Sequence, residues 1–259
     1  MPELPDVECF RRIMADCARD RIVERVDVAD AGVLHGVSKQ RLKRELEGSR
    51  FGEPWRHGKW LIAPSDGTTV ILHFGMTGSL LCCSRDDPPE AHDRVILTLG
   101  NGRQLRYRDQ RKLQGLRVAG SDAAVEKILA SQGPDALTIS RSEFNTALEG
   151  RRGRIKGVLM DQSVMAGLGN LLVDEILWRA RVAPARRADG LAEHERRDVH
   201  TAMGRVLRSA VRVGCVPARR SWLTGHRDAP HPACPRCGQP LRRDRMSGRT
   251  TVWCPHCQH

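Results

Sequence analysis

The sequence predicts an α+β protein: an N-terminal β-sandwich with flanking helices, then a helical bundle and a C-terminal cysteine-rich hairpin. Three observations carry this prediction. Short strand-like runs fill the first part of the chain, amphipathic helical stretches follow, and four cysteines in two pairs stand near the end. We therefore expect three domains, over residues 1–120, 121–220 and 221–259.

The first domain is expected to begin with a helix over residues 6–18, because apolar residues from Val7 to Cys17 recur with helical spacing. The spacing then changes to that of strands. Asp66-Gly67 and Asn101-Gly102 are dipeptides that supply the positive φ of tight hairpin turns. The expected strands cover residues 22–28, 59–64, 68–74, 94–99 and 103–109.

The second domain is expected to be helical. Ser140 and Glu143 have the spacing of a capping box, which marks the start of a helix. Gly214 follows a long amphipathic stretch and is expected to end it. The expected helices cover residues 144–150, 154–162, 170–181 and 192–214.

The composition indicates a polyanionic partner. Lys plus Arg number 43 and Asp plus Glu 31, a net charge of +12, and most of the excess lies in the second half of the chain. Neutralising phosphates releases counterions and favours binding. A genome rich in G and C also raises the arginine content, so charge alone does not establish a nucleic-acid partner. No apolar run is long enough to span a membrane and no signal peptide is evident, so we expect a cytoplasmic location.

Four of the nine cysteines have the spacing C-x2-C, sixteen residues, C-x2-C, which is typical of a four-thiolate zinc ribbon. Zinc contributes about 10–16 kcal/mol to the folding of a small finger, which a segment this short needs. Two disulfides are the alternative, and they fit poorly without a secretion signal. The expected zinc ligands are Cys234, Cys237, Cys254 and Cys257. We expect the other five to be buried thiols: Cys9, Cys17, Cys82, Cys83 and Cys215.

A glycine-rich turn, Ala-Gly-Leu-Gly-Asn, joins two helical stretches and ends at Asn170. Gly167 and Gly169 permit a tight turn, and Asn170 can cap the next helix. A helix N-terminus offers unpaired N–H groups, so the turn is a candidate phosphate clamp with Lys156 nearby. An ordinary packing turn between helices is an equally good interpretation of the turn alone.

Six motifs in order resemble the formamidopyrimidine-DNA glycosylase and endonuclease VIII family, and together they span the chain. The resemblance implies a helix-two-turn-helix in the second domain and a zinc finger at the end. The motifs are "MPELPDVE", "GKWLI", "HFGMTGSL", "AHDRVILTLGNGRQLRYRDQRKLQG", "IKGVLMDQSVMAGLGN" and "GRTTVWCPHCQ".

The resemblance implies four catalytic residues. Pro2, exposed by removal of Met1, would attack C1′ of the damaged nucleotide through its secondary amine. An α-amino group has a reference pKa of about 7.7–8.0, so part of it is unprotonated near neutral pH. Glu3 would be the proton-transferring carboxylate. Lys59 would serve the lesion and its 5′ phosphate, and Arg249 would act in the final elimination.

The same resemblance implies a set of DNA contacts. An enzyme that extrudes a nucleotide must fill the space left in the duplex, and Met76, Arg111 and Leu113 match the residues that do so. The remaining implied contacts to phosphates and strands are His73, His92, Lys156 and Asn170.

Three positions depart from the formamidopyrimidine branch. Leu113 replaces a common phenylalanine, Gln110 replaces a proline, and Asp6 replaces a glutamate. We expect only about seven residues, 215–221, between the long helix and the ribbon's first strand, where members of the family that act on purines carry a longer loop. The preferred lesion therefore stays open between oxidised purines and oxidised pyrimidines.

The resemblance implies a monomeric, bacterial-type, nucleoid-associated DNA glycosylase and AP lyase of base excision repair. It would act on double-stranded DNA with oxidised bases or abasic sites, cut by β,δ-elimination, and hold one structural Zn²⁺. The alternative is a non-catalytic zinc-ribbon protein that binds damaged or abasic DNA. Association with RNA is a third hypothesis, which leaves the first domain without a role.

Overall fold

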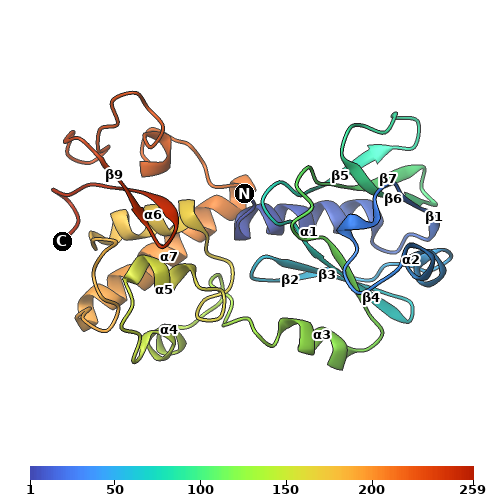
Figure 1. The fold of residues 1–259 in the computed structure, drawn as a ribbon, viewed down its shortest axis with the longest axis horizontal. Coiled ribbons are helices and arrows are strands. Elements are labelled where there is room, and N and C mark those ends of the chain that lie inside the picture. Colours follow the sequence, from blue (N-terminus) through green and yellow to red (C-terminus); the bar gives the residue numbers. More distant parts are fainter. The chain divides into compact units, whose positions relative to one another are not determined.

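The computed structural model describes residues 1–259 and has the predicted α+β fold class (Figure 1). The contacts between Cα atoms divide the chain into two compact units. The first unit comprises residues 1–2 and 6–130. The second comprises residues 3–5 and 131–259, so the short segment Glu3–Pro5 belongs with the later part of the chain.

The first unit contains two four-stranded antiparallel sheets. One sheet has the strand order β2-β3-β4-β8 and the other has β1-β6-β7-β5. Strands β2 and β3 form a hairpin whose register pairs His57 with Trp60. The strands are β1 (Val23–Val28), β2 (Trp55–His57), β3 (Trp60–Ser65), β4 (Thr68–His73), β5 (Ser79–Ser84), β6 (Asp93–Leu99), β7 (Arg103–Arg108) and β8 (Leu116–Ala119).

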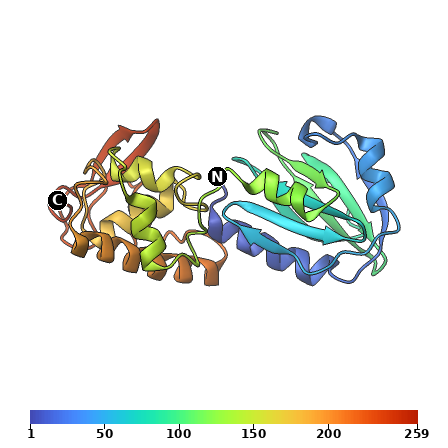
Figure 2. The ribbon, with the colours of Figure 1, turned by 90° about the horizontal axis from the view of Figure 1, so that it is seen from below.

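Helix α1 (Leu4–Ala18) runs along the first unit (Figure 2). Its buried side chains, such as Val7 and Met14, share one hydrophobic core with Leu72 of β4 and Leu105 of β7. The other helical elements of this unit are η1 (Ala31–Val33), α2 (Lys39–Leu46) and α3 (Asp122–Leu129). Helix α3 follows residue 120, where we expected the first domain to end, and contacts β8.

Three short strands and two short α-helices were not predicted from the sequence: β2, β5, β8, α2 and α3. They are three to eight residues long, too short for a period to emerge. In α2, only Leu42 and Leu46 are buried, so its apolar face is a single pair. Helix α1 also begins two residues earlier than expected, at Leu4.

The prediction of five buried thiols is wrong. Cys17, in the last turn of α1, forms a disulfide with Cys82 of β5, with an S–S distance of 2.05 Å. Cys9 and Cys83 are half-buried and Cys215 is exposed. The pairing joins cysteines 65 positions apart in the sequence, a separation that no local pattern reports.

The second unit is a helical bundle that carries a β-hairpin. The expected capping box forms at Ser140 and Glu143, and Gly214 ends the longest helix with φ 81°, as predicted. Leu4 belongs to the segment Glu3–Pro5, which is part of this unit, and it is fully buried in the core of the bundle. The helical elements are α4 (Arg141–Leu148), α5 (Ile155–Met160), α6 (Asn170–Ala180), α7 (Glu193–Val213) and η2 (Leu223–Gly225).

The hairpin comprises β9 (Arg242–Met246) and β10 (Arg249–Trp253), which are joined by a two-residue turn. The expectation that only residues 215–221 separate the long helix from the ribbon's first strand is wrong, because α7 ends at Val213 and β9 begins at Arg242. Ser247 and Gly248 both have positive φ, 49° and 72°, as a tight turn of this kind requires. Trp178 of α6 lies in the same small core as the hairpin's Val252. None of the helices in the structure is both long and apolar enough to cross a membrane.

Candidate active site and zinc centre

The carboxylate of Glu3 binds the N-terminus of α6 within the second unit. Its Oε1 accepts a hydrogen bond from the backbone N–H of Leu171 (2.8 Å), and its Oε2 accepts one from the N–H of Leu172 (3.1 Å). The side chain is 1% exposed. Unpaired N–H groups and the positive end of the helix dipole both stabilise an anion at this position. The first turn of α6 thus orients the carboxylate.

The glycine-rich turn makes room for Glu3. A methyl group at Gly169 would lie 2.3 Å from the Cδ of Glu3, closer than any side chain tolerates. Gly167 has φ 110°, and its carbonyl accepts a hydrogen bond from the N–H of Leu4 (3.1 Å). At the amides of Leu171 and Leu172, the anion is therefore the protein's own glutamate and not a phosphate.

Asn170 and Lys156 differ from their expected geometry. The N-cap of α6 is Gly169, and Asn170 instead donates from Nδ2 to the carbonyl of Thr250 in β10 (3.0 Å). Lys156 is fully buried, and its Nζ lies 2.6 Å from Oδ1 of Asp174. The direct phosphate contact that we expected of Lys156 needs an exposed ammonium, which this burial does not provide.

Lys59 and His73 belong to the first unit. Lys59 follows Gly58 in the β2–β3 turn, where Gly58 has φ 56°. His73, at the end of β4, accepts a hydrogen bond at Nδ1 from the N–H of Gly75 (3.1 Å), and its ring lies edge-on to Trp60. Burial, followed by the positive charge of Lys59, lowers the pKa of His73 to about 4. The imidazole is therefore neutral near pH 7.

The three candidate void-filling residues lie on two neighbouring loops of the first unit. Nη1 of Arg111 lies 3.1 Å from Sδ of Met76. The backbone N–H of Arg111 donates to Oγ1 of Thr77 (3.1 Å), which ties the two loops together. Leu113 is 49% exposed, unusual for a large apolar side chain. Met76 thus offers an apolar side chain beside the Arg111 guanidinium, and Leu113 offers an exposed one two residues further along the Arg111 loop.

His92 is exposed and has φ 73°, in the left-handed region. Its Nδ1 lies 3.0 Å from Nη2 of Arg94. Arg94 in turn donates from Nε to the carbonyl of Asp109 (2.8 Å), two residues before Arg111. The sequence analysis did not single out Arg94, which connects His92 to the Arg111 loop.

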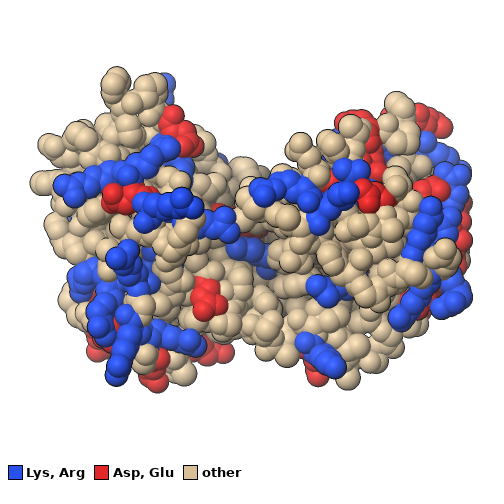
Figure 3. Space-filling view, viewed as in Figure 1, with Lys and Arg blue, Asp and Glu red and all other residues tan.

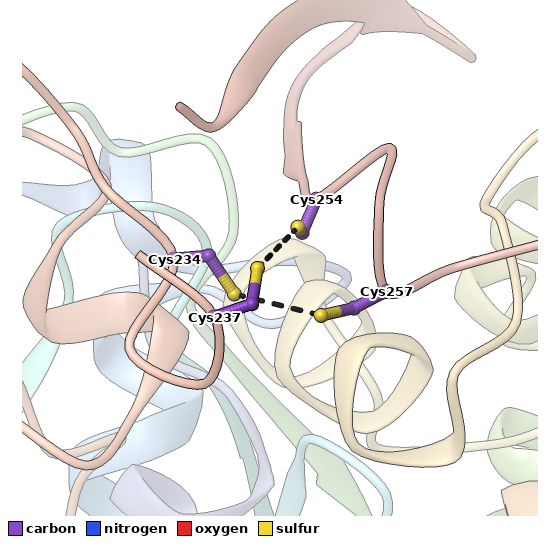
Figure 4. A group of neighbouring side chains, drawn as sticks. All are labelled: Cys234, Cys237, Cys254 and Cys257. Carbon is purple, nitrogen blue, oxygen red and sulfur yellow. Dashed lines mark hydrogen bonds between the residues drawn. The ribbon is translucent and has the colours of Figure 1, made fainter. Parts of the chain in front are cut away.

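The four predicted zinc ligands converge (Figure 4). Their sulfurs all lie within 4.8 Å of one another, with Cys237 to Cys254 at 3.6 Å and Cys234 to Cys257 at 4.0 Å. A tetrahedral Zn²⁺ with Zn–S bonds of about 2.3 Å places its sulfurs about 3.8 Å apart. The geometry supports one structural zinc, as predicted. Four thiolates fill the coordination shell.

Trp178 is a part of the zinc centre that the sequence analysis missed. Its indole N–H donates to Sγ of Cys234 (3.3 Å), and the Arg236 guanidinium lies over the ring, 4.4 Å from its centre. Helix α6 therefore supports the zinc-binding residues with one end and Glu3 with the other. No pattern in the sequence distinguishes Trp178 from any other apolar residue of a helix.

Arg249 begins β10, directly after the hairpin turn, and is exposed. On the face drawn in Figure 3, lysine and arginine side chains are more abundant than acidic ones on both units. This distribution agrees with the net charge of +12. It favours a polyanionic ligand.

Three family models match the chain in sequence order. Residues 1–116 match the formamidopyrimidine-DNA glycosylase N-terminal domain, and residues 131–220 match the H2TH domain of the same family. Residues 233–259 match the zinc finger found in FPG and IleRS. The chain thus contains, in order, the three domains of a zinc-finger DNA glycosylase.

Whole-chain comparisons agree. A formamidopyrimidine-DNA glycosylase of Heliobacterium modesticaldum is 33% identical over 279 residues and covers 100% of both chains. The LlFpg protein in a complex with THF-DNA and an inhibitor has a TM-score of 0.91 at 27% identity, with 100% of both chains covered. Lactococcus lactis Fpg (MutM) in a complex with an oxidized pyrimidine containing DNA has a TM-score of 0.90 at 28% identity, with 99% of both covered.

The chain belongs to the formamidopyrimidine-DNA glycosylase family. As a member of this family, it is a base-excision-repair DNA glycosylase and AP lyase.

Proposed function

We propose that this enzyme removes oxidised bases from double-stranded DNA and then cuts the strand by β- and δ-elimination. The observation that carries the proposal is the Glu3 carboxylate, buried and fixed by the amides of Leu171 and Leu172 directly after Pro2. A helix-bound carboxylate next to a secondary amine gives a proton-transfer group and a nucleophile on consecutive residues.

Pro2 is the proposed nucleophile. After removal of Met1, its ring nitrogen would attack C1′ of the damaged nucleotide as the base departs. The secondary amine then forms a charged iminium with the opened sugar. This cation withdraws electrons, acidifies the proton on C2′ and allows the 3′ phosphate to leave. Glu3 would protonate the sugar ring oxygen and transfer protons in the later steps.

Lys59 and Arg249 are the proposed cationic catalysts. Lys59 would bind the lesion and its 5′ phosphate from the β2–β3 turn, and its positive charge helps to keep His73 neutral. Arg249 would assist the second elimination from the hairpin. Its exposure at the start of β10 is what a residue that must meet a phosphate requires.

The proposed DNA contacts fall into two groups, residues that fill the space in the duplex and residues that contact the strand. Met76, Arg111 and Leu113 would fill the space left by the extruded nucleotide, and their neighbouring loops support a joint role. His73, His92 and Asn170 remain proposed contacts to the DNA strand. For Lys156 we replace direct phosphate contact with an indirect role, because its ammonium is bound to Asp174.

Formamidopyrimidines and oxidised pyrimidines are both proposed substrates. The family name specifies the first class, and the Lactococcus lactis relative was solved with DNA that contains an oxidized pyrimidine. We also propose that the enzyme acts as a monomer at the bacterial nucleoid. Residues 1–120, 121–220 and 221–259 remain the proposed functional division of the chain.

A panel of duplexes tests this proposal. Each duplex carries 8-oxoguanine, formamidopyrimidine, thymine glycol, dihydrouracil or an abasic site, and denaturing gels separate the β- from the δ-elimination products. We expect cleavage of the abasic duplex and of at least one oxidised purine and one oxidised pyrimidine. Tight binding without any cleavage would favour the non-catalytic alternative.

A further inference from the structure

A buried group of charges joins α5, α6 and the hairpin in the second unit. Asp174 of α6 accepts hydrogen bonds from Nζ of Lys156 (2.6 Å) and from Nη1 of Arg227 (3.0 Å). The three side chains are 0%, 2% and 7% exposed for Lys156, Asp174 and Arg227. None of them can therefore bind DNA directly. We call these three residues the Asp174 cluster.

The cluster holds the backbone of β10. Oδ2 of Asp174 accepts a hydrogen bond from the N–H of Val252 (3.1 Å). The carbonyl of Thr250 accepts three donors: Nδ2 of Asn170 (3.0 Å), Nη2 of Arg227 (3.3 Å) and Nζ of Lys156 (3.4 Å). A carbonyl oxygen has two lone pairs, so three donors around it are an unusually dense arrangement. They fix the residue that directly follows Arg249.

The hairpin turn has a second fixed point on α5. A methyl group at Gly157 would lie 2.7 Å from Oγ of Ser247, so the turn packs against the helix where a side chain is missing. Lys156 is the neighbour of Gly157. Arg249 thus lies between a turn that packs on α5 and a carbonyl that the Asp174 cluster holds.

The same contacts bring the start of β10 to the Glu3 end of α6. Asn170 binds the Thr250 carbonyl, and the next residue, Leu171, binds the Glu3 carboxylate. Asn170 and Leu171 are adjacent at the start of α6. One holds the residue that follows Arg249, and the other holds Glu3. A shift of β10 would move Arg249 relative to Glu3.

Stability alone is a poor explanation for the Asp174 cluster. Burial raises the pKa of Asp174 and lowers the pKa of Lys156, while the contacts between the two side chains oppose both shifts. Burying three charges costs desolvation energy, and apolar side chains of similar size often serve stability as well. What apolar side chains cannot supply is a set of directed hydrogen bonds to two backbone groups of β10.

We infer that Asp174 and Arg227 are positioning residues that, with Lys156, hold β10 so that Arg249 can act in the second elimination step. This inference rests on the role proposed above for Arg249. Base removal and the first elimination depend on Pro2 and Glu3, and the backbone of Leu171 and Leu172 in α6, not β10, holds the Glu3 carboxylate. Loss of the cluster should therefore slow the second elimination more than the first.

The test compares Arg227→Met and Asp174→Asn with wild type on an abasic duplex. Arg227→Met is the main variant, because it leaves the ion pair between Lys156 and Asp174 in place. We expect its ratio of δ- to β-elimination product to fall at least fivefold, with the β-elimination rate within twofold of wild type and one zinc per chain. Hydrogen exchange over residues 249–253 should rise. Arg227→Lys, which retains a donor, should recover part of the ratio.

Asp189→Asn is the matched control, because Asp189 forms an ion pair with Arg187 at the surface of the same unit (2.7 Å). An unchanged product ratio in zinc-loaded Arg227→Met, or an equal loss of both eliminations, would overturn the inference. If Arg227→Met loses zinc, the ratio of δ- to β-elimination product in Asp174→Asn and Arg227→Lys tests the inference in its place. A wild-type enzyme that forms neither product would instead contradict the proposed function.

Discussion

The Oε1 atom of Glu3 lies 2.8 Å from the backbone nitrogen of Leu171, although 168 positions separate the two residues in the sequence. This hydrogen bond and its partner at Leu172 orient the carboxylate at the positive end of α6. Their formation depends on a glycine at position 169, where a side chain would collide with Glu3.

Gly169→Ala should therefore displace Glu3 and reduce base excision about 100-fold, the lower range of what acid–base catalysis contributes. Single-turnover kinetics on a duplex with an oxidised base measures the loss. Gly190→Ala is the control, since a methyl group there makes only ordinary contact, at 3.6 Å from the nearest atom. Equal rates for wild type and Gly169→Ala would mean that the Glu3 geometry is irrelevant to catalysis.

Cys254→Ser should release zinc and destabilise the hairpin. The four sulfurs form one cluster, and a finger of this size draws about 10–16 kcal/mol from its metal. Elemental analysis should find well below one zinc per chain, together with weaker binding to abasic DNA. Cys215→Ser, at an exposed cysteine outside the cluster, should keep its zinc. Full zinc content in Cys254→Ser would show that the ligand set is wrong.

Leu113→Ala should separate activity from stability. Leu113 is 49% exposed, so its truncation should change the free energy of unfolding by no more than about 0.5 kcal/mol. Extruding a nucleotide costs a few kcal/mol of unstacking, and a shorter side chain at position 113 would offset less of it, so we expect base excision to slow about tenfold. Thermal melting and single-turnover kinetics measure the two effects. Ile22→Ala, at another exposed apolar residue of the first unit, should leave both unchanged.

His73 should stay neutral in the folded protein down to about pH 4, because burial lowers its pKa from 6.5 to about 4. The unfolded chain binds this proton at a higher pH, so stability should fall as the pH drops from 6.5 towards 4. The upper limit of the loss is about 3 kcal/mol.

NMR titration of the imidazole measures the His73 pKa directly, and His73→Asn assigns the signal. Asparagine can still accept the hydrogen bond from Gly75, so this variant should keep its fold while losing the pH dependence. A midpoint near 6.5 for His73 would contradict the prediction.

Patterns within one element were predictable from the sequence. The spacing of the four cysteines predicted the zinc centre, and the capping box at Ser140 and Glu143 formed as expected. Partners from distant elements were not predictable, because periodicity reports only which face a residue occupies. The disulfide between Cys17 and Cys82 and the Trp178 contact with Cys234 belong to this second kind.

Charged residues showed the same limit. A lysine near a helix N-terminus is typical of a phosphate-binding site. Only the fold reveals that the ammonium of Lys156 forms an ion pair with Asp174. An anion site at the α6 N-terminus was one of two interpretations of the glycine-rich turn, and a helix end does not indicate which anion it binds. Here the anion is the carboxylate of Glu3. The resemblance of "MPELPDVE" to its family indicated a catalytic role for Glu3 but not its contact with α6.

The central claim is that the N-terminal amine of Pro2 attacks C1′ of the damaged nucleotide, and borohydride trapping tests it most directly. The enzyme, freed of Met1, is mixed with an abasic duplex and sodium borohydride, and the adduct is digested and mapped by mass spectrometry. We expect one covalent adduct, on Pro2, and none in protein that retains Met1. An adduct on Lys59 or another lysine, or efficient strand cutting without any trapped adduct, would contradict the account.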